Sequence, residues 1–393
     1  MTAEVVFFVC LALWLHTYLL FPLTLPLFSG WLGRRIWKGD EEDSQWAPKV
    51  SILVSAFNEE TVIEAKIRNC LELDYPPERL QILIGDDGSK DHTAEIIRRY
   101  MPKVTLIQAE RNQGKAAMLN RLAQQADGDI LLFCDANTLF FPNVVRKLTQ
   151  PFTKGRIGCV CGHLILSDES GSALGEGEAA YWDFESEIKK FEGLLGVVIG
   201  GNGAIYAIRR NLFTPLPVQR SVMDDFYVTV KILQQGYQSI FISSAIGTEQ
   251  TSKAGVGEFY RKVRIGRANF NYLFSYLPLL NPFRPLVAYF FFSHKLLRWF
   301  SPHLILGIVL TNIALWNHGI GFQITLMLEL LVFLLGLAGL AMGNGRRKLF
   351  FINYPFYFLT MNFALFRGFL QSFRSGSGGG WSRVERSAGG VPI

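Results

Sequence analysis

Residues 80–100 read LQILIGDDGSKDHTAEIIRRY, and this stretch decides the class of fold. Its first half, LQILIGDDGS, is an apolar run of strand length that ends in a turn rich in Asp, Gly and Ser, the residues that favour turns. Its second half, DHTAEIIRRY, is typical of a short helix. The order predicts a strand, a polar loop and a helix.

The same order of elements extends to both sides of this unit. Upstream, KVSILVSAF (49–57) is a β-branched strand segment, and EETVIEAKIRNCLEL (59–73) has helical spacing and begins with acidic residues. Downstream follow a strand, a helix and another strand: VTLIQAE (104–110), GKAAMLNRLAQQA (114–126) and DILLFCDAN (129–137). This alternation predicts an α/β fold with a mostly parallel sheet and helices on both faces.

Polar residues gather where the predicted strands end. The four motifs are SAFNEE (55–60), GDDGSKDHT (85–93), RNQGKAAMLN (111–120) and CDANT (134–138). In a parallel sheet the carboxyl ends of the strands meet at one edge, and ligands bind there. A single motif of this kind is as often an ordinary turn. Four of them on successive strand ends predict a cleft that contains acids, a lysine and small residues.

Two oxygen-bearing residues stand at the end of LLFCDANT (131–138), namely Asp135 and Asn137. Residues i and i+2 of an extended chain point to the same side, so both side chains are predicted to face one spot. Carboxylate and amide oxygens there raise the question of a metal ion, since Mg²⁺ prefers oxygen ligands.

Two common nucleotide-binding motifs are absent from the sequence. A P-loop needs a glycine at position 109 and Ser or Thr at position 116, and both positions are alanine here. GGNGAIYAIRR (200–210) lacks the full dinucleotide fingerprint. These departures argue against an ATPase and against NAD binding.

The composition indicates a membrane protein with a soluble central part. Hydrophobic residues make up 49% of the 393 residues and charged residues only 18%, and the apolar excess lies at the two ends. The net charge is +6, and the basic clusters GRRIWK (33–38) and GRRK (345–348) adjoin apolar segments. That position favours contact with membrane lipids, and no nucleic acid partner is expected. The five cysteines are scattered, which predicts no disulfide framework.

The N-terminal residues 1–30 are predicted to form a transmembrane helix. The apolar run from Val5 to Leu27 is long enough to cross about 30 Å of hydrocarbon. No basic region precedes the run and no small-residue cleavage site follows it, which favours an uncleaved helix over a signal peptide. The linker, residues 31–48, begins with basic residues, so the domain that follows is expected to be cytoplasmic.

The C-terminal third of the chain is predicted to return to the membrane. Residues 271–301 are expected to lie in the interface, and residues 302–374 to contain transmembrane helices, with candidate spans at 302–316, 322–342 and 350–373. The last of these also fits an interfacial or packed helix, because it contains Asn353, Asn362 and Arg367. Residues 375–393 are expected to be a flexible tail. The whole chain is expected to be a multi-pass protein of the plasma (inner) membrane.

The ordered motifs from about residue 50 to residue 268 resemble the family 2 glycosyltransferases, which are inverting enzymes with the GT-A fold. The resemblance is strongest to their membrane-embedded branch, which is similar to polysaccharide synthases. It implies that residues 49–270 form a GT-A domain that binds a nucleotide sugar. By this resemblance, Asp86 and Asp87 are expected to contact the uracil and ribose of a UDP-sugar, and Glu59 is expected to lie near the base. Lys115 is expected to lie near the diphosphate. Asn202, in GGNGAIYAIRR, is expected to line the donor and acceptor sugars.

The same resemblance implies a metal site and a catalytic base. CDANT takes the place of the family's metal-binding DxD motif, so Asp135 and Asn137 are the expected contacts of a divalent cation, Mg²⁺ or Mn²⁺. VMDDFYVTVKILQQGY (222–237) takes the place of the family's TED motif. Within it, Asp225 occupies the position of the family's catalytic base. Asp224 is expected to orient the acceptor or to favour the helix N-terminus. The alternative is that both aspartates only cap a helix.

One departure from the family pattern affects the expected product. Processive members carry a QxxRW motif before the membrane helices, and its Trp stacks on the acceptor sugar. Here Arg261 takes the Gln position, Arg264 retains the Arg, and Ile265 replaces the Trp. This argues against processive synthesis. The remaining cationic cluster contacts a diphosphate or lipid headgroups in one interpretation and is a solvated interfacial face in the other.

The function expected from the sequence is transfer of a sugar from a nucleotide sugar to a glycan or lipid-linked acceptor, with formation of a β-glycosidic bond. The alternative is a catalytically weak binding subunit of a polysaccharide synthesis complex. Partners in polysaccharide synthesis or export fit both interpretations.

Overall fold

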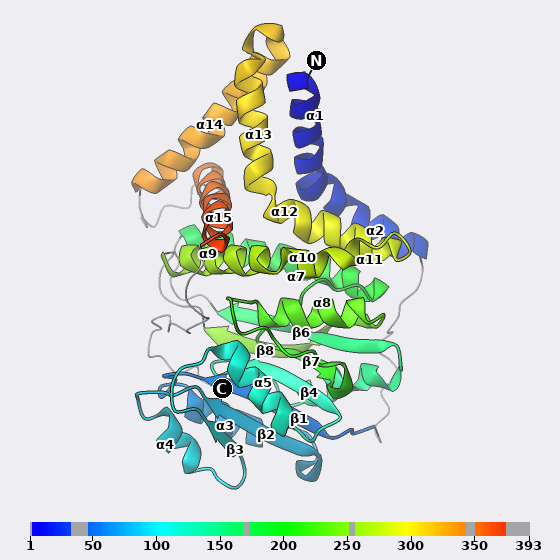
Figure 1. Cartoon of the computed structure of the whole chain (residues 1–393), viewed down its shortest axis with the longest axis vertical. Coiled ribbons are helices and arrows are strands. Elements are labelled where there is room, and N and C mark those ends of the chain that lie inside the picture. Colours follow the sequence, from blue (N-terminus) through cyan, green and yellow to red (C-terminus); the bar gives the residue numbers. More distant parts are fainter. Residues whose placement is uncertain (1, 33–45, 168–172, 251–255, 343–349, 375–393) are drawn as a thin grey trace.

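The computed structural model describes residues 2–32, 46–167, 173–250, 256–342 and 350–374. Most of the predicted linker (31–48) and all of the predicted tail (375–393) therefore lie outside the described residues. The described residues form an α/β domain, a layer of helices that lies across it, and helices that project away from that layer (Figure 1).

The α/β domain contains one eight-stranded sheet in the order β3-β2-β1-β4-β7-β6-β8-β5. The pairs β1–β2, β1–β4, β2–β3 and β6–β8 are parallel, whereas β7 and β5 are antiparallel to their neighbours. The mostly parallel α/β sheet predicted from the sequence is thus confirmed. The strands are β1 (Val50–Ala56), β2 (Leu80–Asp86), β3 (Thr105–Gln108), β4 (Ile130–Asp135), β5 (Leu139–Phe140), β6 (Ile157–Ser167), β7 (Tyr206–Arg209) and β8 (Gln238–Gln250).

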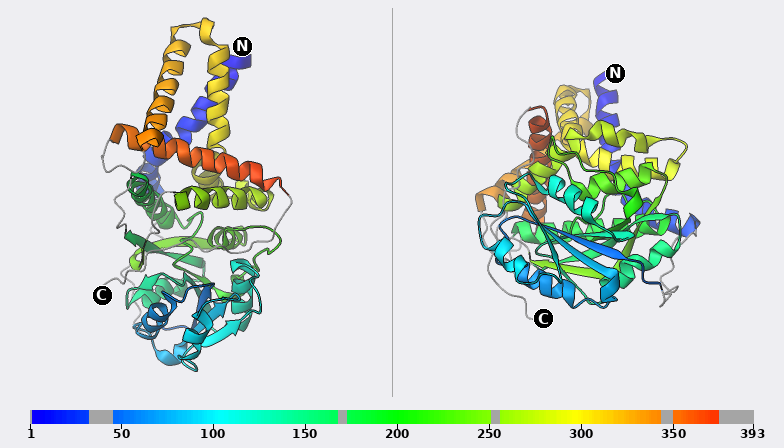
Figure 2. Two further views of the ribbon diagram at one scale, coloured as in Figure 1. Left: turned by 90° about the vertical axis from the view of Figure 1, so that its left-hand side faces the viewer. Right: turned by 60° about the horizontal axis from the view of Figure 1, so that its bottom comes forward.

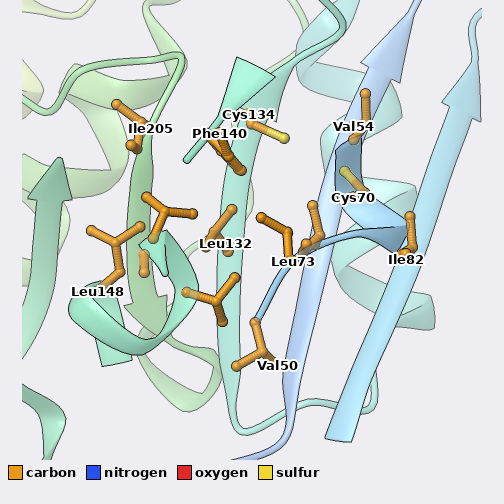
Figure 3. Packing of buried hydrophobic residues seen from close by; sticks show 14 of the residues in the cluster. Val50, Val54, Cys70, Leu73, Ile82, Leu132, Cys134, Phe140, Leu148 and Ile205 are labelled. Carbon is orange, nitrogen blue, oxygen red and sulfur yellow. The ribbon is translucent and has the colours of Figure 1, made fainter. Parts of the chain in front are cut away.

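Hydrophobic clusters cover both faces of the sheet. All seven residues of β1 are buried, because a strand at the centre of a parallel sheet packs on both sides. Val50 and Val54 lie beside Leu132 of β4 in one cluster (Figure 3), and Leu53 belongs to the cluster on the opposite face. The helices packed around the sheet are α3 (Ile63–Leu71), α4 (Thr93–Arg98), α5 (Lys115–Gln125), α6 (Val144–Thr149) and α8 (Asp224–Gln234).

The pairing register places the strand ends at one level. Ala56 at the end of β1 pairs with Asp86 at the end of β2, and Ser55 pairs with Asp135 at the end of β4. The loops that follow β1, β2 and β4 therefore leave the sheet at the same edge, as the sequence predicted. This edge carries the candidate site.

Two long helices and a set of short ones form the layer across the α/β domain. The long ones are α7 (Ala173–Leu195) and α9 (Val256–Asn271). The short ones are α10 (Leu273–Tyr276), α11 (Pro285–Phe290), a π-helical turn (Phe291–Leu296) and α12 (Leu297–Trp299). A third hydrophobic cluster joins this layer to α8 and to the N-terminal helices, with Phe226, Tyr276 and Phe290 among its buried members.

Two helices among the described residues are long and apolar enough to cross a membrane, Thr2–Phe28 and Ile320–Met342. The first combines α1 (Thr2–Leu15), a π-helical turn (His16–Leu20) and most of α2 (Phe21–Leu32), and the second is α14. A bent pair, Pro285–Trp299 and α13 (Ser301–Ala314), adds a third if its two parts, 64° apart, count as one span. In Figure 1, α1, α13 and α14 project to the same side of the α/β domain.

The last helix, α15 (Phe350–Ser372), takes a different direction from α13 and α14. Figure 2 shows it lying across them and alongside α9. The two helices touch at glycines: a Cβ on Gly368 would lie 2.6 Å from the backbone oxygen of Val263, and one on Gly266 would lie 3.2 Å from that of Leu365. This placement favours the interfacial alternative for residues 350–373 over a third separate span.

Candidate active site

The first part of the site is a turn that follows β2 and holds the loop before α5. Asp86 and Asp87 are both fully buried. The Asp87 carboxylate accepts the backbone N–H groups of Gln113 (2.9 Å) and Gly114 (2.8 Å), and that of Asp86 accepts the N–H of Ser89 (3.2 Å). Burial raises the pKa of Asp87, and the two bonds from the loop partly offset this effect. Both aspartates therefore shape the loops at the sheet edge.

Glu59 stands beside this turn, as predicted. Its side chain is 5% exposed, and its backbone N–H donates to Thr93 Oγ1 at 2.8 Å. The neighbouring Asn58 has φ of +54°, and its N–H donates to Ser89 Oγ at 2.9 Å. The loop after β1 and the loop after β2 are thus joined into one wall of the site.

The second part of the site is a lysine between two carboxylates. Lys115, the first residue of α5, lies 2.8 Å from Oδ1 of Asp135 at the end of β4 and 3.2 Å from Oδ2 of Asp224 at the start of α8. Burial acts to lower the pKa of Lys115, but the two carboxylates outweigh it, and the pKa is raised. Three motifs that lie up to 109 positions apart in the sequence meet here. The strand pattern predicted a shared edge for the motifs of Lys115 and Asp135, and only the family resemblance pointed to that of Asp224.

The chain from Asp135 to Asn137 is not extended, so the geometry from which a shared direction of their side chains was predicted was wrong. β4 ends at Asp135, and the chain then turns, with the Thr138 N–H 3.3 Å from the Asp135 carbonyl oxygen. The Asn137 amide instead donates to Oε1 of Glu249 on β8 at 2.7 Å. The residue that sequence reasoning missed here is Glu249, whose position depends on the pairing of β8 with β6 and has no local signal.

The third part of the site is Asp225, the second residue of α8. Its Oδ1 atom is buried and has no hydrogen-bond partner among the residues that the structure describes. A glycine loop passes directly against it: a Cβ on Gly203 would lie 3.5 Å from its Cγ, and one on Gly201 would lie 3.6 Å from its Cβ. Burial and the adjacent Asp224 raise the pKa of Asp225 to about 6, while Lys189 and Lys115 act in the opposite direction.

Lys189 on α7 is a buried cation that sequence reasoning missed. Its ammonium donates to the carbonyl oxygen of Gly201 at 3.3 Å and to Oδ1 of Asn202, whose own amide donates to the carbonyl oxygen of Gly162 at 2.7 Å. Asn202 is 3% exposed. Lys189 occurs in a run of mostly charged residues, ESEIKK, that is typical of a solvated helix face, so its burial has no signal in the sequence.

The cationic residues of α9 lie beside this part of the site. The Arg261 guanidinium is 5.8 Å from the centroid of the Trp182 ring on α7, and Lys189 Nζ is 6.0 Å from the same centroid. The pKa of Arg264 is lowered by desolvation and by Arg261, against the effect of Asp224 and Asp135. Arg264 is therefore close enough to both carboxylates to act on the same charges as Lys115.

The donor set fits a divalent cation only with help from a ligand. Asp135 and Asp224 offer carboxylates on either side of Lys115. Among the described residues there is no group of three or more His, Cys, Asp and Glu side chains that could hold a metal by itself. Mg²⁺ and Mn²⁺ accept oxygen ligands, and Mg²⁺ commonly binds through one or two carboxylates plus substrate phosphates. The residues present therefore suit a metal that arrives together with phosphate oxygens.

Fold and site together define an α/β protein with a candidate ligand site at the carboxyl edge of the sheet, where the buried carboxylate of Asp225 lies near the cations Lys115 and Lys189. Residues 51–213 match the model of the glycosyl transferase family 2. Over these residues the chain is similar to the family 2 glycosyltransferases.

Curated relatives share this similarity, and a solved structure supports the fold. An N-acetylglucosaminyltransferase of Rhizobium meliloti (strain 1021) is 25% identical over 62% of this chain and 60% of its own length. A poly-beta-1,6-N-acetyl-D-glucosamine synthase of Staphylococcus epidermidis is 28% identical over 40% of this chain and 39% of its own length. This chain therefore spans no more than 60% of either relative. A Pyrobaculum calidifontis mannosyltransferase, solved in complex with GDP-Man and Mn²⁺, shares the fold with a TM-score of 0.66, 20% identity and coverage of 93% of this chain and 98% of its own.

Proposed function

We propose that this protein is a membrane-bound inverting glycosyltransferase that moves a sugar from a nucleotide sugar, UDP-linked, to a glycan or lipid-linked acceptor and forms a β-glycosidic bond. The observation that carries the proposal is Asp225, a buried carboxylate with its pKa raised to about 6 and an unpartnered Oδ1, beside the Lys115 pocket. A general base works best when its pKa lies near the working pH, because it is then both ionised and basic enough to take a proton.

The reaction is a single displacement. The acceptor hydroxyl gives its proton to Asp225 as its oxygen bonds to the anomeric carbon, and the bond from that carbon to the diphosphate oxygen breaks on the opposite face. The diphosphate leaves with the bonding electron pair, so the configuration at the anomeric carbon is inverted. Lys115 and Arg264 stabilise the negative charge that develops on the leaving group.

Donor binding divides among the remaining site residues. Asp86, Asp87 and Glu59 form the wall that receives the base and ribose, and Asp87 also fixes the Gln113–Gly114 backbone that precedes Lys115. Asp135 is the carboxylate that would hold a divalent cation, and Asn137, whose Nδ2 donates to Glu249, would offer its neutral Oδ1 as a second contact. When bound, the cation neutralises charge on the diphosphate. The complex of the Pyrobaculum mannosyltransferase with GDP-Man and Mn²⁺ supports a metal of this kind.

The acceptor enters on the side of Trp182. Lys189 links this ring to Asn202 and Gly201, and the glycine loop lies against Asp225, so the ring is near the base. The Trp182 indole, with the Arg261 guanidinium over its ring at 5.8 Å, is an aromatic group that can stack on a sugar, a role that Ile265 cannot fill. The helices α9 and α15 lie between this region and the membrane helices, which supports an acceptor that reaches the site from the membrane surface.

The catalytic domain is placed on the cytoplasmic side of the plasma (inner) membrane. The basic residues Arg34, Arg35 and Lys38 follow the N-terminal apolar helix, and positive charge favours the cytoplasmic side. Nucleotide sugars are expected on the same side, together with partners that make or export polysaccharide.

Release of nucleotide diphosphate from membranes that contain the protein tests this proposal. UDP-GlcNAc is the first donor to assay, because the relatives named above are N-acetylglucosamine transferases; UDP-glucose and GDP-mannose are the comparisons. We expect turnover that EDTA abolishes and that Asp225→Asn lowers by about 10²- to 10⁴-fold. The exposed acid Glu72, changed to Gln, serves as the matched control.

The second candidate function is a binding subunit without turnover, which the replacement at Ile265 and the orientation of Asn137 favour. Saturable binding of a nucleotide sugar with no release of diphosphate for any donor and acceptor would support it. Full activity of Asp225→Asn would reject the assigned base but not the transferase.

A further inference from the structure

Five ionisable side chains meet in the interior between α7 and the π-helical segment that leads to α12. We call them the His294 cluster: Glu185, Glu192, His294, Lys295 and Arg298. His294 and Glu192 are fully buried. His294 contacts Glu192 through Nδ1 (2.5 Å) and Glu185 through Nε2 (3.0 Å). Glu185 also binds Lys295 and, at 3.0 Å, Arg298.

Glu185 remains a carboxylate despite its burial. Burial acts to raise the pKa of Glu185, but His294 and Lys295 outweigh it and hold that pKa well below its usual range. Removing one partner of a buried ion pair destabilises the fold strongly, because it leaves the other charge buried without compensation. Replacing the whole pair by apolar residues costs much less. The cluster is therefore a specific junction, unlike the apolar contacts around it.

The junction also contacts the N-terminal helix. Thr17 Oγ1 donates to the carbonyl oxygen of Ser293 at 2.6 Å, and His16 Nε2 lies 2.8 Å from Ser293 Oγ. The Phe21 ring is stacked with His294 at a centroid distance of 5.9 Å. Residues on the N-terminal span and on the interfacial segment thus fix the position of one imidazole.

The other end of the junction reaches the active site. Oε1 of Glu192 faces His294, and its Oε2 accepts the backbone N–H of Ile199 at 3.1 Å. Ile199 precedes Gly200, which has φ of +92° and packs on Phe226, and then Gly201 and Asn202. One turn earlier on the same face of α7, Lys189 binds those last two residues.

If Glu192 only anchored α7 to the interfacial segment, its contact with His294 would be sufficient. One carboxylate oxygen of Glu192 contacts the interfacial segment and the other contacts the glycine loop. A shift of the interfacial segment would therefore also move the glycine loop. The loop is also the segment that borders Asp225. This division distinguishes a positioning contact from a purely stabilising one.

We propose that Glu192 is a positioning residue, held by His294, that fixes residues 199–203 beside the catalytic base and so makes the acceptor side of the site depend on the seating of the membrane-interfacial segment. The catalytic consequence rests on the proposed function, whereas the structural one does not. A change at the junction is expected to loosen the loop and weaken productive acceptor binding, with donor binding unchanged.

Hydrogen–deuterium exchange of the full chain in lipid nanodiscs tests the structural step without any substrate. His294→Leu removes both imidazole contacts, and His294→Asn keeps a donor for Glu192. We expect exchange in peptides covering 197–203 to rise about tenfold or more in His294→Leu, because the Ile199 N–H loses its fixed acceptor, and to be largely restored in His294→Asn. Lys190→Gln, on the exposed face of α7, should leave it unchanged.

Two matched variants of Glu192 separate positioning from stability. Glu192→Gln keeps an oxygen for the Ile199 N–H and is expected to loosen 197–203 less than Glu192→Leu does. Exchange at 197–203 that stays at the wild-type rate in His294→Leu and Glu192→Leu would overturn the proposal, and so would equal acceleration over the whole α/β domain. If the loop responds as expected while no donor is turned over by the wild type, the positioning role stands and the proposed function fails.

Discussion

The raised pKa of Asp225 implies that this proposed base destabilises the fold when it is ionised. Its carboxyl pKa is raised from 3.8 to about 6, so the folded protein binds this proton more tightly than the unfolded chain does. Stability from this group is therefore gained as the pH falls through 6 and is complete below 3.8. Above pH 6 the ionised carboxylate costs about 2 pKa units, or roughly 3 kcal/mol.

Asp225→Asn replaces this carboxylate by a neutral group of the same shape and should stabilise the protein at pH 8. For a domain of 150–250 residues, 1 kcal/mol corresponds to about 2–4 °C in Tm, so we expect a rise of roughly 5–10 °C at pH 8. At pH 5 the folded carboxyl is mostly protonated but the unfolded one is still ionised, so the difference should fall to roughly half of its value at pH 8 and approach zero only below pH 3.8. Turnover should be lost at both pH values.

Thermal unfolding in detergent from pH 5 to pH 8.5, followed by tryptophan fluorescence, measures this effect. Glu72→Gln provides the control, because its exposed carboxyl should give the same small shift at every pH. The reasoning would be refuted if the Tm gain of Asp225→Asn over wild type did not change with pH. It would also be refuted if this gain were smaller at pH 8 than at pH 5. In that case Asp225 would not be strained in its ionised form.

Four further predictions address other parts of the site and fold. Lys189→Met removes a positive charge near the base, so the acidic limb of the kcat/KM profile for the donor should move up by about one pH unit. Lys115→Met should weaken UDP binding measured by calorimetry, yet strengthen Mn²⁺ binding to the nucleotide-free protein about tenfold, because it frees two carboxylates. Trp182→Ala should raise the acceptor KM about 3- to 10-fold with the donor KM unchanged, and no change in acceptor KM would reject the stacking role. Gly128→Ala should lower the unfolding free energy by about 1–3 kcal/mol, since its Cβ would lie 2.5 Å from the Ser51 nitrogen, whereas Gly155→Ala, with open space around it, should not.

The local pattern of the sequence was sufficient for the α/β domain. β1, α3, β2 and α4 all lie within the segments predicted for them, because apolar periodicity and turn residues determine such elements. Parallel pairing then brings strand ends together wherever the strands are in register. For this reason Lys115 and Asp135 could be placed at one edge from the strand pattern, whereas Asp224 was expected near them only by family resemblance.

The parts of the site that the sequence could not supply come from distant elements. Lys189 and Trp182 reach the site only because α7 crosses the sheet edge, and Glu249 only because β8 pairs with β6. The direction of Asn137 depends on a single turn after β4, which periodicity does not reveal. α15 has the length of a span, but its packing against α9 gives it another direction.

The charges in the site explain why metal and donor should bind together. The carboxylates of Asp135, Asp224 and Asp225 are balanced by the cations Lys115, Lys189 and Arg264. A divalent cation alone would be repelled by Lys115, which already contacts two of the acids, and a diphosphate alone would meet those acids uncompensated. A diphosphate that carries two negative charges is neutral together with a divalent cation, so the pair enters without upsetting the balance. Weak metal binding without nucleotide, and tight binding with UDP, is therefore the expected behaviour, and equal affinity in both cases would contradict the assignment of Asp135.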